Sequence, residues 1–106
     1  MTPIESKRLI ATFMNYAGGK PLTDELLLTL YNDWNSIMPV VDKIEDIIVD
    51  GDNSFNVTIG ATNYCVIQDS WGELIEISDI YRETKLLTVE ATIVKFIQWY
   101  YLNQIT

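Results

Sequence analysis

The spacing of apolar residues changes twice along this chain, and this change restricts the folds that the chain can adopt. Towards both ends, apolar residues recur every three or four positions, which is the period of a helix. Between residues 54 and 77 they alternate with polar residues, as in a strand that has one solvated face. Helical segments that flank a run of short strands predict an α+β domain.

A first helix is expected at the amino terminus. Thr2 is a residue type that caps helices, Pro3 suits the first helical position, and Glu5 completes a capping box. Gly18 is the expected end of this helix, because glycine adopts positive φ without steric cost. The apolar residues that share one face are Ile10, Phe13, Met14 and Ala17.

A second helix is expected to begin with Asn35 or Ser36 as its cap. Pro39 would then lie in its first turn, and the apolar stripe would run on to Ile48 and pack onto a sheet. The leucine-rich segment 24–33 is too short for its period to decide between a helix capped by Thr23 and an edge strand.

The last helix has the most regular pattern of the chain. Thr84 is its expected cap, and it should run to about Asn103. Its apolar stripe consists of Leu86, Val89, Ile93, Phe96, Ile97 and Tyr100, whereas Trp99, Tyr101 and Leu102 lie off the stripe. These three residues either widen the buried face or form an exposed apolar patch.

The central segment predicts an antiparallel meander. Strands are expected at 55–59, 64–68 and 74–77, separated by turn-forming residues, and Asp50–Asn53 has the composition of a tight turn. The expected fold is a single α+β domain over residues 1–106. A small antiparallel sheet of about three to four strands would pack against two or three helices, in the order α, then β or α, then α-β-β-β-α.

Charge along the chain excludes some partners. The net charge is −8, and the eight acidic residues between Lys43 and Arg82 have no basic residue among them. Direct binding of nucleic acid through this stretch is disfavoured, because phosphate contacts need clustered lysine or arginine. A host protein with a basic surface is the partner that such a stretch fits, and a solvated acidic surface is the simpler interpretation.

The composition lacks several residue types and motifs that enzymes use for catalysis. There is no histidine, which excludes a Ser-His-Asp or Cys-His arrangement. The one cysteine, Cys65, falls in an expected strand and is interpreted as an inert thiol. No motif for a cofactor, phosphate or metal is present, and the turn at Asp50 has Ala61 where a calcium loop needs glutamate. We therefore expect a protein that is not an enzyme and binds no cofactor.

Aromatic residues at segment ends are the best candidates for binding. Trp71 falls in a turn, and Trp34 begins a helix between Asp33 and Asn35, where backbone N–H groups are free to meet a ligand. Completion of a small core is the alternative role for these rings. The neighbouring acidic candidates for the same binding surface are Glu73, Glu76 and Asp79.

Four segments of the sequence, two in each half of the chain, resemble a known family. The segments LIATFM (residues 9–14) and DWNSIMPVVDKIE (33–45) are followed by ETKL (83–86) and FIQWY (96–100). They are similar to IAEFM, SWDWLMPVVEKIE and ESKIEA…VVEFIKWYN in an uncharacterised family of small proteins of phages and mobile elements. Asn35 and Ser36 replace the acidic-aromatic pair that follows the tryptophan in that family. The resemblance implies an accessory protein that acts on host machinery or host defence.

These observations rank the functions. The leading hypothesis is a non-enzymatic binding module that blocks a host protein through an acidic and aromatic surface. The alternatives are a protein that sequesters a small nucleotide signal, and a structural homo-oligomer that uses Trp99, Tyr101 and Leu102. The first residues lack the apolar run of a signal peptide, and no segment has the length of a membrane span, so a cytoplasmic location is expected, within the host cell if the protein is viral.

Overall fold

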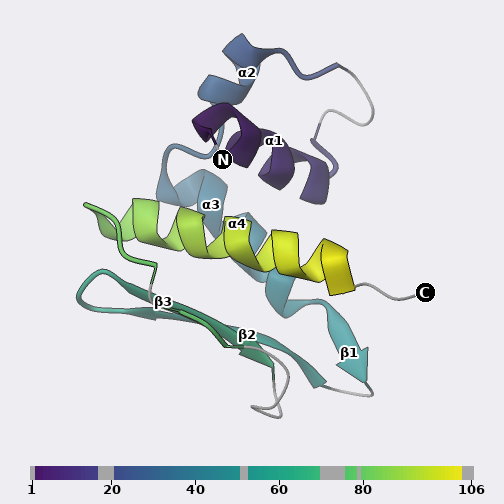
Figure 1. The fold of residues 1–106 in the computed structure, drawn as a ribbon, viewed down its shortest axis with the longest axis vertical. Helices are drawn as coiled ribbons and strands as arrows, with labels where there is room; N and C mark the ends of the chain where they lie inside the picture. Colours follow the sequence, from purple (N-terminus) through teal and green to yellow (C-terminus); the bar gives the residue numbers. More distant parts are fainter. Residues whose placement is uncertain (1, 17–20, 51–52, 70–75, 79, 104–106) are drawn as a thin grey trace.

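The computed structural model describes residues 2–16, 21–50, 53–69, 76–78 and 80–103 (Figure 1). Within them the chain forms four helices and one antiparallel sheet, which confirms the predicted α+β class. The helices are α1 (Pro3–Phe13), α2 (Asp24–Leu28), α3 (Trp34–Glu45) and α4 (Lys85–Asn103). The strands are β1 (Ile48–Asp50), β2 (Asn53–Gly60), β3 (Tyr64–Asp69) and β4 (Glu76–Ile77).

The elements form three layers. Helices α3 and α4 lie side by side across one face of the sheet, and α1 and α2 form a further layer beyond them (Figure 1). Helix α4 contacts β3 and β4, α3 contacts β2, and α1 packs against α2 and α4. Helices α3 and α4 therefore cover the same face of the sheet, as their apolar stripes predict.

The register of the sheet decides which strand residues enter the core. All neighbouring strands are antiparallel, in the order β1-β2-β3-β4. Val57 pairs with Ile67, and Ile67 pairs in turn with Ile77, so these side chains face the helices. Because side chains alternate along a strand, Thr58 and Gln68 point to the opposite face, where they are exposed.

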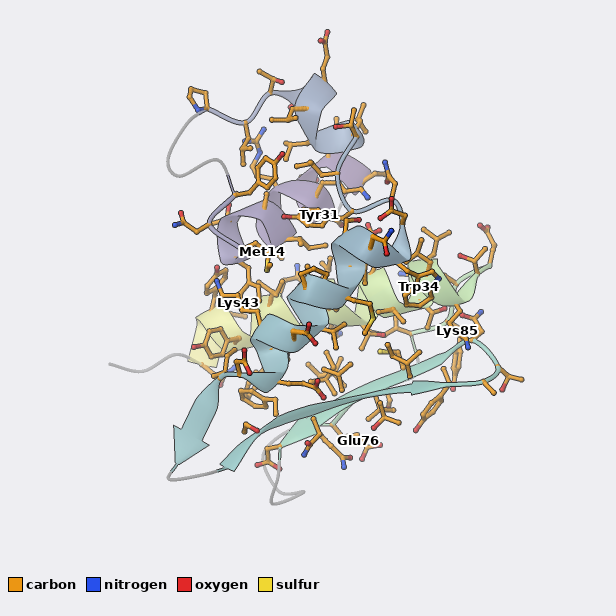
Figure 2. All side chains as sticks on the ribbon, turned by 180° about the vertical axis from the view of Figure 1, so that it is seen from behind. Met14, Tyr31, Trp34, Lys43, Glu76 and Lys85 are labelled. Carbon is orange, nitrogen blue, oxygen red and sulfur yellow. The ribbon has the colours of Figure 1, made fainter. Side chains whose placement is uncertain are left out.

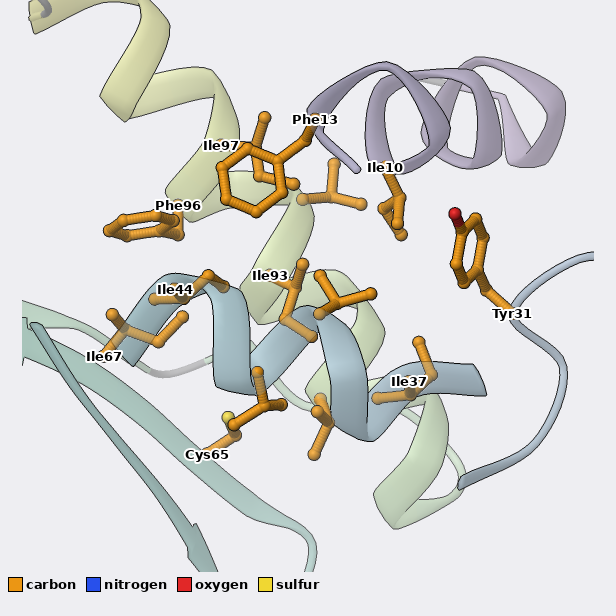
Figure 3. Packing of buried hydrophobic residues seen from close by; sticks show 14 of the residues in the cluster. Ile10, Phe13, Tyr31, Ile37, Ile44, Cys65, Ile67, Ile93, Phe96 and Ile97 are labelled. Atoms are coloured by element: carbon orange, nitrogen blue, oxygen red, sulfur yellow. The ribbon is translucent and has the colours of Figure 1, made fainter. Parts of the chain in front are cut away.

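The core fills the space between the sheet and α1 (Figure 3). Its centre contains the fully buried Ile93 and Phe96 of α4 and Ile67 of β3. Phe96 meets Phe55 edge-on at 4.9 Å between ring centroids, and Tyr100 stacks on Phe96 at 5.8 Å. Aromatic pairs of this geometry add to the free energy of area burial. The predicted stripe of α4 is buried or half-buried throughout, and Thr88, Thr92 and Val94, which the stripe did not include, are buried as well.

Local capping signals account for two helix starts. The Thr2 hydroxyl accepts the N–H of Glu5, and the Glu5 carboxylate accepts the N–H of Thr2, which is the predicted capping box. Thr84 likewise accepts the N–H of Leu87 at the start of α4. The segment that the sequence left open, 24–33, begins with the short helix α2, and Thr23 caps it.

The predicted start of α3 is wrong. Asp33, and not Asn35 or Ser36, is the N-cap, and its carboxylate accepts the N–H of Ser36 at 2.9 Å. Pro39 consequently lies inside the helix and not in its first turn. A proline there removes the donor that would reach the carbonyl of Asn35, and the helix continues because its apolar face remains packed.

Helix ends also differ from the prediction. Helix α1 ends at Phe13, before the predicted stop at Gly18, and Asn15 takes a positive φ of 53° just beyond it. Gly18 itself lies outside the described residues. Helix α3 ends at Glu45, so Ile48 belongs to β1 and not to the helical stripe. Apolar residues at a helix–strand junction fit both periods, and pairing of Ile48 with Ser54 of β2 decides the outcome here.

A buried lysine joins three separate parts of the chain. The ammonium of Lys7 on α1 donates to the carbonyl of Tyr31 at 3.0 Å and to Oδ1 of Asn32 at 2.7 Å. It also pairs with Glu90 of α4 at 3.4 Å, and the side chains of Lys7 and Glu90 are only 7% and 14% exposed. Tyr31 holds a positive φ of 56°. Lys7 thus satisfies its three donors and fixes the α2–α3 connection against α1 and α4.

We predict that Lys7→Met lowers the free energy of unfolding by about 3 kcal/mol, because it leaves the carboxylate of Glu90 largely buried without its counter-charge. Urea denaturation measures the change. The neighbouring substitution Arg8→Met is the matched control. It removes a surface pair with Asp24, whose side chain is 68% exposed, and should cost less than about 1 kcal/mol.

The double variant Lys7→Met/Glu90→Met should recover part of the loss, because no unpaired charge remains. Recovery should be incomplete, because the carbonyl of Tyr31 and the side-chain amide oxygen of Asn32 still lack the hydrogen bond that the Lys7 ammonium donates. Equal destabilisation by Lys7→Met and Arg8→Met would contradict this account of the buried pair.

Candidate functional site

The structure brings three of the predicted binding residues together at the start of α3. Asp33, Trp34 and Asn35 are consecutive and exposed, and Trp34 is the first helical residue (Figure 2). The N–H of Ser36 is already taken by the carboxylate of Asp33. A negative charge therefore occupies this helix start, which disfavours an anionic ligand there.

An exposed line of side chains continues from Trp34 along α3. Met38, Asp42 and Glu45 follow at spacings of four, four and three residues, so they lie on one side of the helix. The side chains of Trp34 and Met38 are 37% and 40% exposed, and both acidic residues are exposed. We call these four residues the α3 line. It combines apolar contact area with negative charge.

Glu45 has a second role at the sheet. Its Oε2 accepts the N–H of Val57 in β2 at 3.2 Å. Strand β1 pairs with β2 only at Ser54 and Asn53, so Glu45 satisfies a donor on the part of the β2 edge that β1 leaves uncovered. Asp42 makes no such contact with the residues that the structure describes, so it is the better residue for testing the α3 line.

The remaining predicted residues do not join this group. Glu76 is exposed on β4 opposite Gln68, on the face of the sheet that the helices leave uncovered (Figure 2). Trp71, Glu73 and Asp79 lie outside the described residues. Of the predicted acidic and aromatic surface, the α3 end and Glu76 are thus on different sides of the sheet.

A groove that the sequence analysis missed runs along α4. It has a volume of about 580 Å³ and lies between α4, the start of α1 and the segment that precedes α4. Its α4 residues recur at helical spacing over three turns, so the groove follows the helix for about 16 Å. The lining residues are Pro3, Ser6, Ile80, Arg82, Leu87, Glu90, Ala91, Val94, Lys95 and Gln98.

The groove combines apolar lining with two cations. Val94 is buried, and Leu87, with a 41% exposed side chain, presents an apolar surface to solvent. Arg82 and Lys95 are both exposed, and neither is paired with a carboxylate among the residues that the structure describes. Glu90 also lines the groove, but its charge is balanced by Lys7. The groove is therefore positive on a chain whose net charge is −8.

Backbone contacts hold Arg82 at the edge of the groove. Its N–H donates to the hydroxyl of Thr88 at 2.9 Å, and its carbonyl accepts the side-chain amide of Asn63. The Thr88 hydroxyl in turn donates to Oδ1 of Asn63. Asn63 sits in the β2–β3 turn with a φ of 49°, so this turn fixes the position of Arg82.

One sequence signal could have pointed to the groove. Every basic residue after Lys43 lies between Arg82 and Lys95, at the start of or within the last helix. Helical spacing places Lys95 on the side of α4 opposite its buried stripe, but the contribution of α1 to the groove depends on tertiary packing. The spacing of residues along the sequence does not show that α1 packs beside α4.

Reactive groups are sparse in the described structure. Cys65 is buried in β3, and burial raises the pKa of its thiol to about 11, although a hydrogen bond with Thr92 acts in the opposite direction. Among the described residues no cluster of three or more Cys, Asp or Glu side chains could hold a metal ion. Of the helices described, not one combines the length and apolar character needed to cross a bilayer.

Comparisons with protein-family models, with curated proteins and with solved structures find no match to this chain.

The buried thiol yields a direct prediction. At pH 8, Cys65 in the folded chain should react with a thiol reagent such as DTNB at least about 100-fold more slowly than in the urea-unfolded chain, because a rise of two pKa units lowers the thiolate fraction that much. A stopped-flow comparison measures both rates. Similar rates would show that the Cys65 thiol is accessible and that its pKa is not raised.

The same pKa shift has a consequence for stability. The neutral thiol is favoured by folding, so its contribution is complete below pH 9 and is lost as the pH rises towards about 11. Wild type should lose more stability across this interval than Cys65→Val, by no more than about 3 kcal/mol. Cys65→Val retains every tyrosine, so the titration of the tyrosines contributes equally to both proteins and cancels in the comparison.

Proposed function

We propose that this chain is a non-enzymatic binding module that attaches to a basic surface of another protein through the α3 line. The observation that carries the proposal is the exposure of Trp34 and Met38 in a row with Asp42 and Glu45. Tryptophan and methionine are enriched at protein interfaces, and tryptophan is among the residues that contribute most to binding free energy.

The negative charge of the α3 line supports a partner with a basic surface. A surface of carboxylates attracts lysine- and arginine-rich surfaces and repels nucleic acid, so the α3 line suits a groove that would otherwise bind phosphates. Occupying such a groove blocks it. The family resemblance of the sequence adds the context of a phage or mobile element, in which the partner is a host protein of defence or nucleic-acid handling.

Rigidity of α3 supports the same function. Its buried face is formed by Ile37, Val40, Val41 and Ile44, and Lys43 donates to the carbonyl of Phe13 while its ammonium lies 4.8 Å from the Phe13 ring centroid. A helix fixed on its inner face presents its outer side chains with little loss of conformational entropy on binding.

The test uses the full chain purified under native conditions from cells that express it naturally, with native mass spectrometry to weigh what accompanies it. We expect a protein partner to co-purify with the wild-type chain and to be absent from the Trp34→Ala and Asp42→Lys variants. Glu25→Lys on α2 is the matched control, because it makes the same change in net charge at an exposed site away from α3. This control should retain the partner.

Affinity for the isolated partner should fall at least about tenfold for Trp34→Ala, as for a central interface residue. It should also fall steeply between low and physiological salt. Affinity that is unaffected by both the substitutions and salt would contradict the proposal. A small molecule released on denaturation would instead favour a ligand-sequestering protein, and an unaccompanied oligomer would favour the structural alternative.

A further inference from the structure

The α4 groove has a polarity opposite to that of the α3 line, and the two lie on opposite sides of the molecule. Helix α4 stands in front of α3 in Figure 1 and behind it in Figure 2. The groove lies on the side of α4 that faces neither α3 nor the sheet, beside the start of α1. A partner bound to the α3 line therefore leaves the groove open.

We propose that the α4 groove is a second binding site, and that it takes an acidic, partly apolar peptide segment of a partner protein. Charge complementarity identifies the occupant. Arg82 and Lys95 provide two positive charges without carboxylate partners in the described structure, and Glu90 does not cancel them because Lys7 already neutralises it. Carboxylates on the occupant would meet these cations.

The shape of the groove selects a peptide over a compact anion. Arg82 precedes α4, whereas Lys95 lies in its third turn, so the cations stand towards different ends of a groove of about 16 Å. Between them the lining includes Leu87, Ala91 and Val94 at helical spacing, together with Glu90, whose charge Lys7 neutralises. A segment with apolar side chains between separated carboxylates fits this order, whereas a single phosphate would contact one end only.

The fixed backbone of Arg82 supports a built site. Its N–H and carbonyl are both held, by Thr88 and Asn63, while the guanidinium bonds only to the carbonyl of Tyr81 among the contacts described. The backbone is thus positioned while the cationic end of the side chain has no carboxylate partner. Preorganisation of this kind reduces the cost of ordering on binding.

The experiment measures fluorescence anisotropy of a labelled synthetic peptide of about 15 residues, long enough to span the groove as a helix. In this probe, leucine recurs every third or fourth position and glutamate fills the rest. We expect saturable binding to the full chain at low salt. Lys95→Glu should weaken it at least about tenfold, which corresponds to about 1.4 kcal/mol.

Matched variants separate groove contacts from general charge. Lys85→Glu changes the net charge equally on the same helix but lies outside the groove, and it should weaken binding less than about threefold. Leu87→Ser should weaken binding, whereas Leu102→Ser, at a side chain 85% exposed beyond the groove, should not. Asp42→Lys should leave binding unchanged, so failure of this site is distinguishable from failure of the α3 proposal.

Several outcomes would overturn the proposal. They are the absence of saturable peptide binding, equal effects of Lys95→Glu and Lys85→Glu, and displacement of the peptide by millimolar inorganic pyrophosphate, which would indicate a site for small anions. Sedimentation that shows a dimer of wild type and a monomer of Lys95→Glu would also overturn it, because a second copy of this acidic chain would then occupy the groove.

Discussion

The ammonium group of Lys7 is the contact on which the arrangement of the helices depends. It is the point where α1, the α2–α3 connection and α4 meet, through Tyr31, Asn32 and Glu90. Burial of a charge is costly unless it is paired and hydrogen-bonded, so this cluster tolerates few other packings of α1. Lys43 adds a second attachment at the opposite end of α1, where its ammonium approaches the carbonyl end of the helix at Phe13. Together these two lysines hold α1 against α3 and α4 and thereby complete one wall of the groove.

The same pairing has an electrostatic consequence for the surface. Lys7 neutralises Glu90 from the interior, so on the outer side of α4 the positive charges of Arg82 and Lys95 have no carboxylate partner among the described residues. The carboxylates of α3 remain on the other side of the molecule, where Asp42 and Glu45 accompany Trp34. A strongly acidic chain thus separates its charges into two surfaces that suit different partners.

Local rules predicted much of the fold, and the exceptions have two causes. The capping box of Thr2 and Glu5 and the apolar stripe of α4 depend on residues close in sequence, and both were predicted correctly. The cap of α3 was misassigned because Asp33, Asn35 and Ser36 are all capping residues, and in the structure Asp33 forms a reciprocal capping box with Ser36. For Trp34 the sequence left a core position and an exposed position both open, and the structure places it 37% exposed. The groove was missed because it requires α1 to lie beside α4, and because Asn63 fixes Arg82 across 19 positions of sequence. Interactions of that range leave no periodic signal.

Two-dimensional ¹H–¹⁵N NMR of the full chain tests whether the α3 line and the α4 groove bind different partners. The glutamate-leucine peptide and its lysine-leucine counterpart would be titrated into separate samples, and the perturbed amides compared. The account predicts two sets that do not overlap: amides of Ser6 and of α4 from Leu87 to Gln98 with the acidic peptide, and amides of α3 with the indole N–H of Trp34 for the basic one. Perturbation of one shared set by both peptides, or of the α3 amides by the acidic peptide, would contradict it.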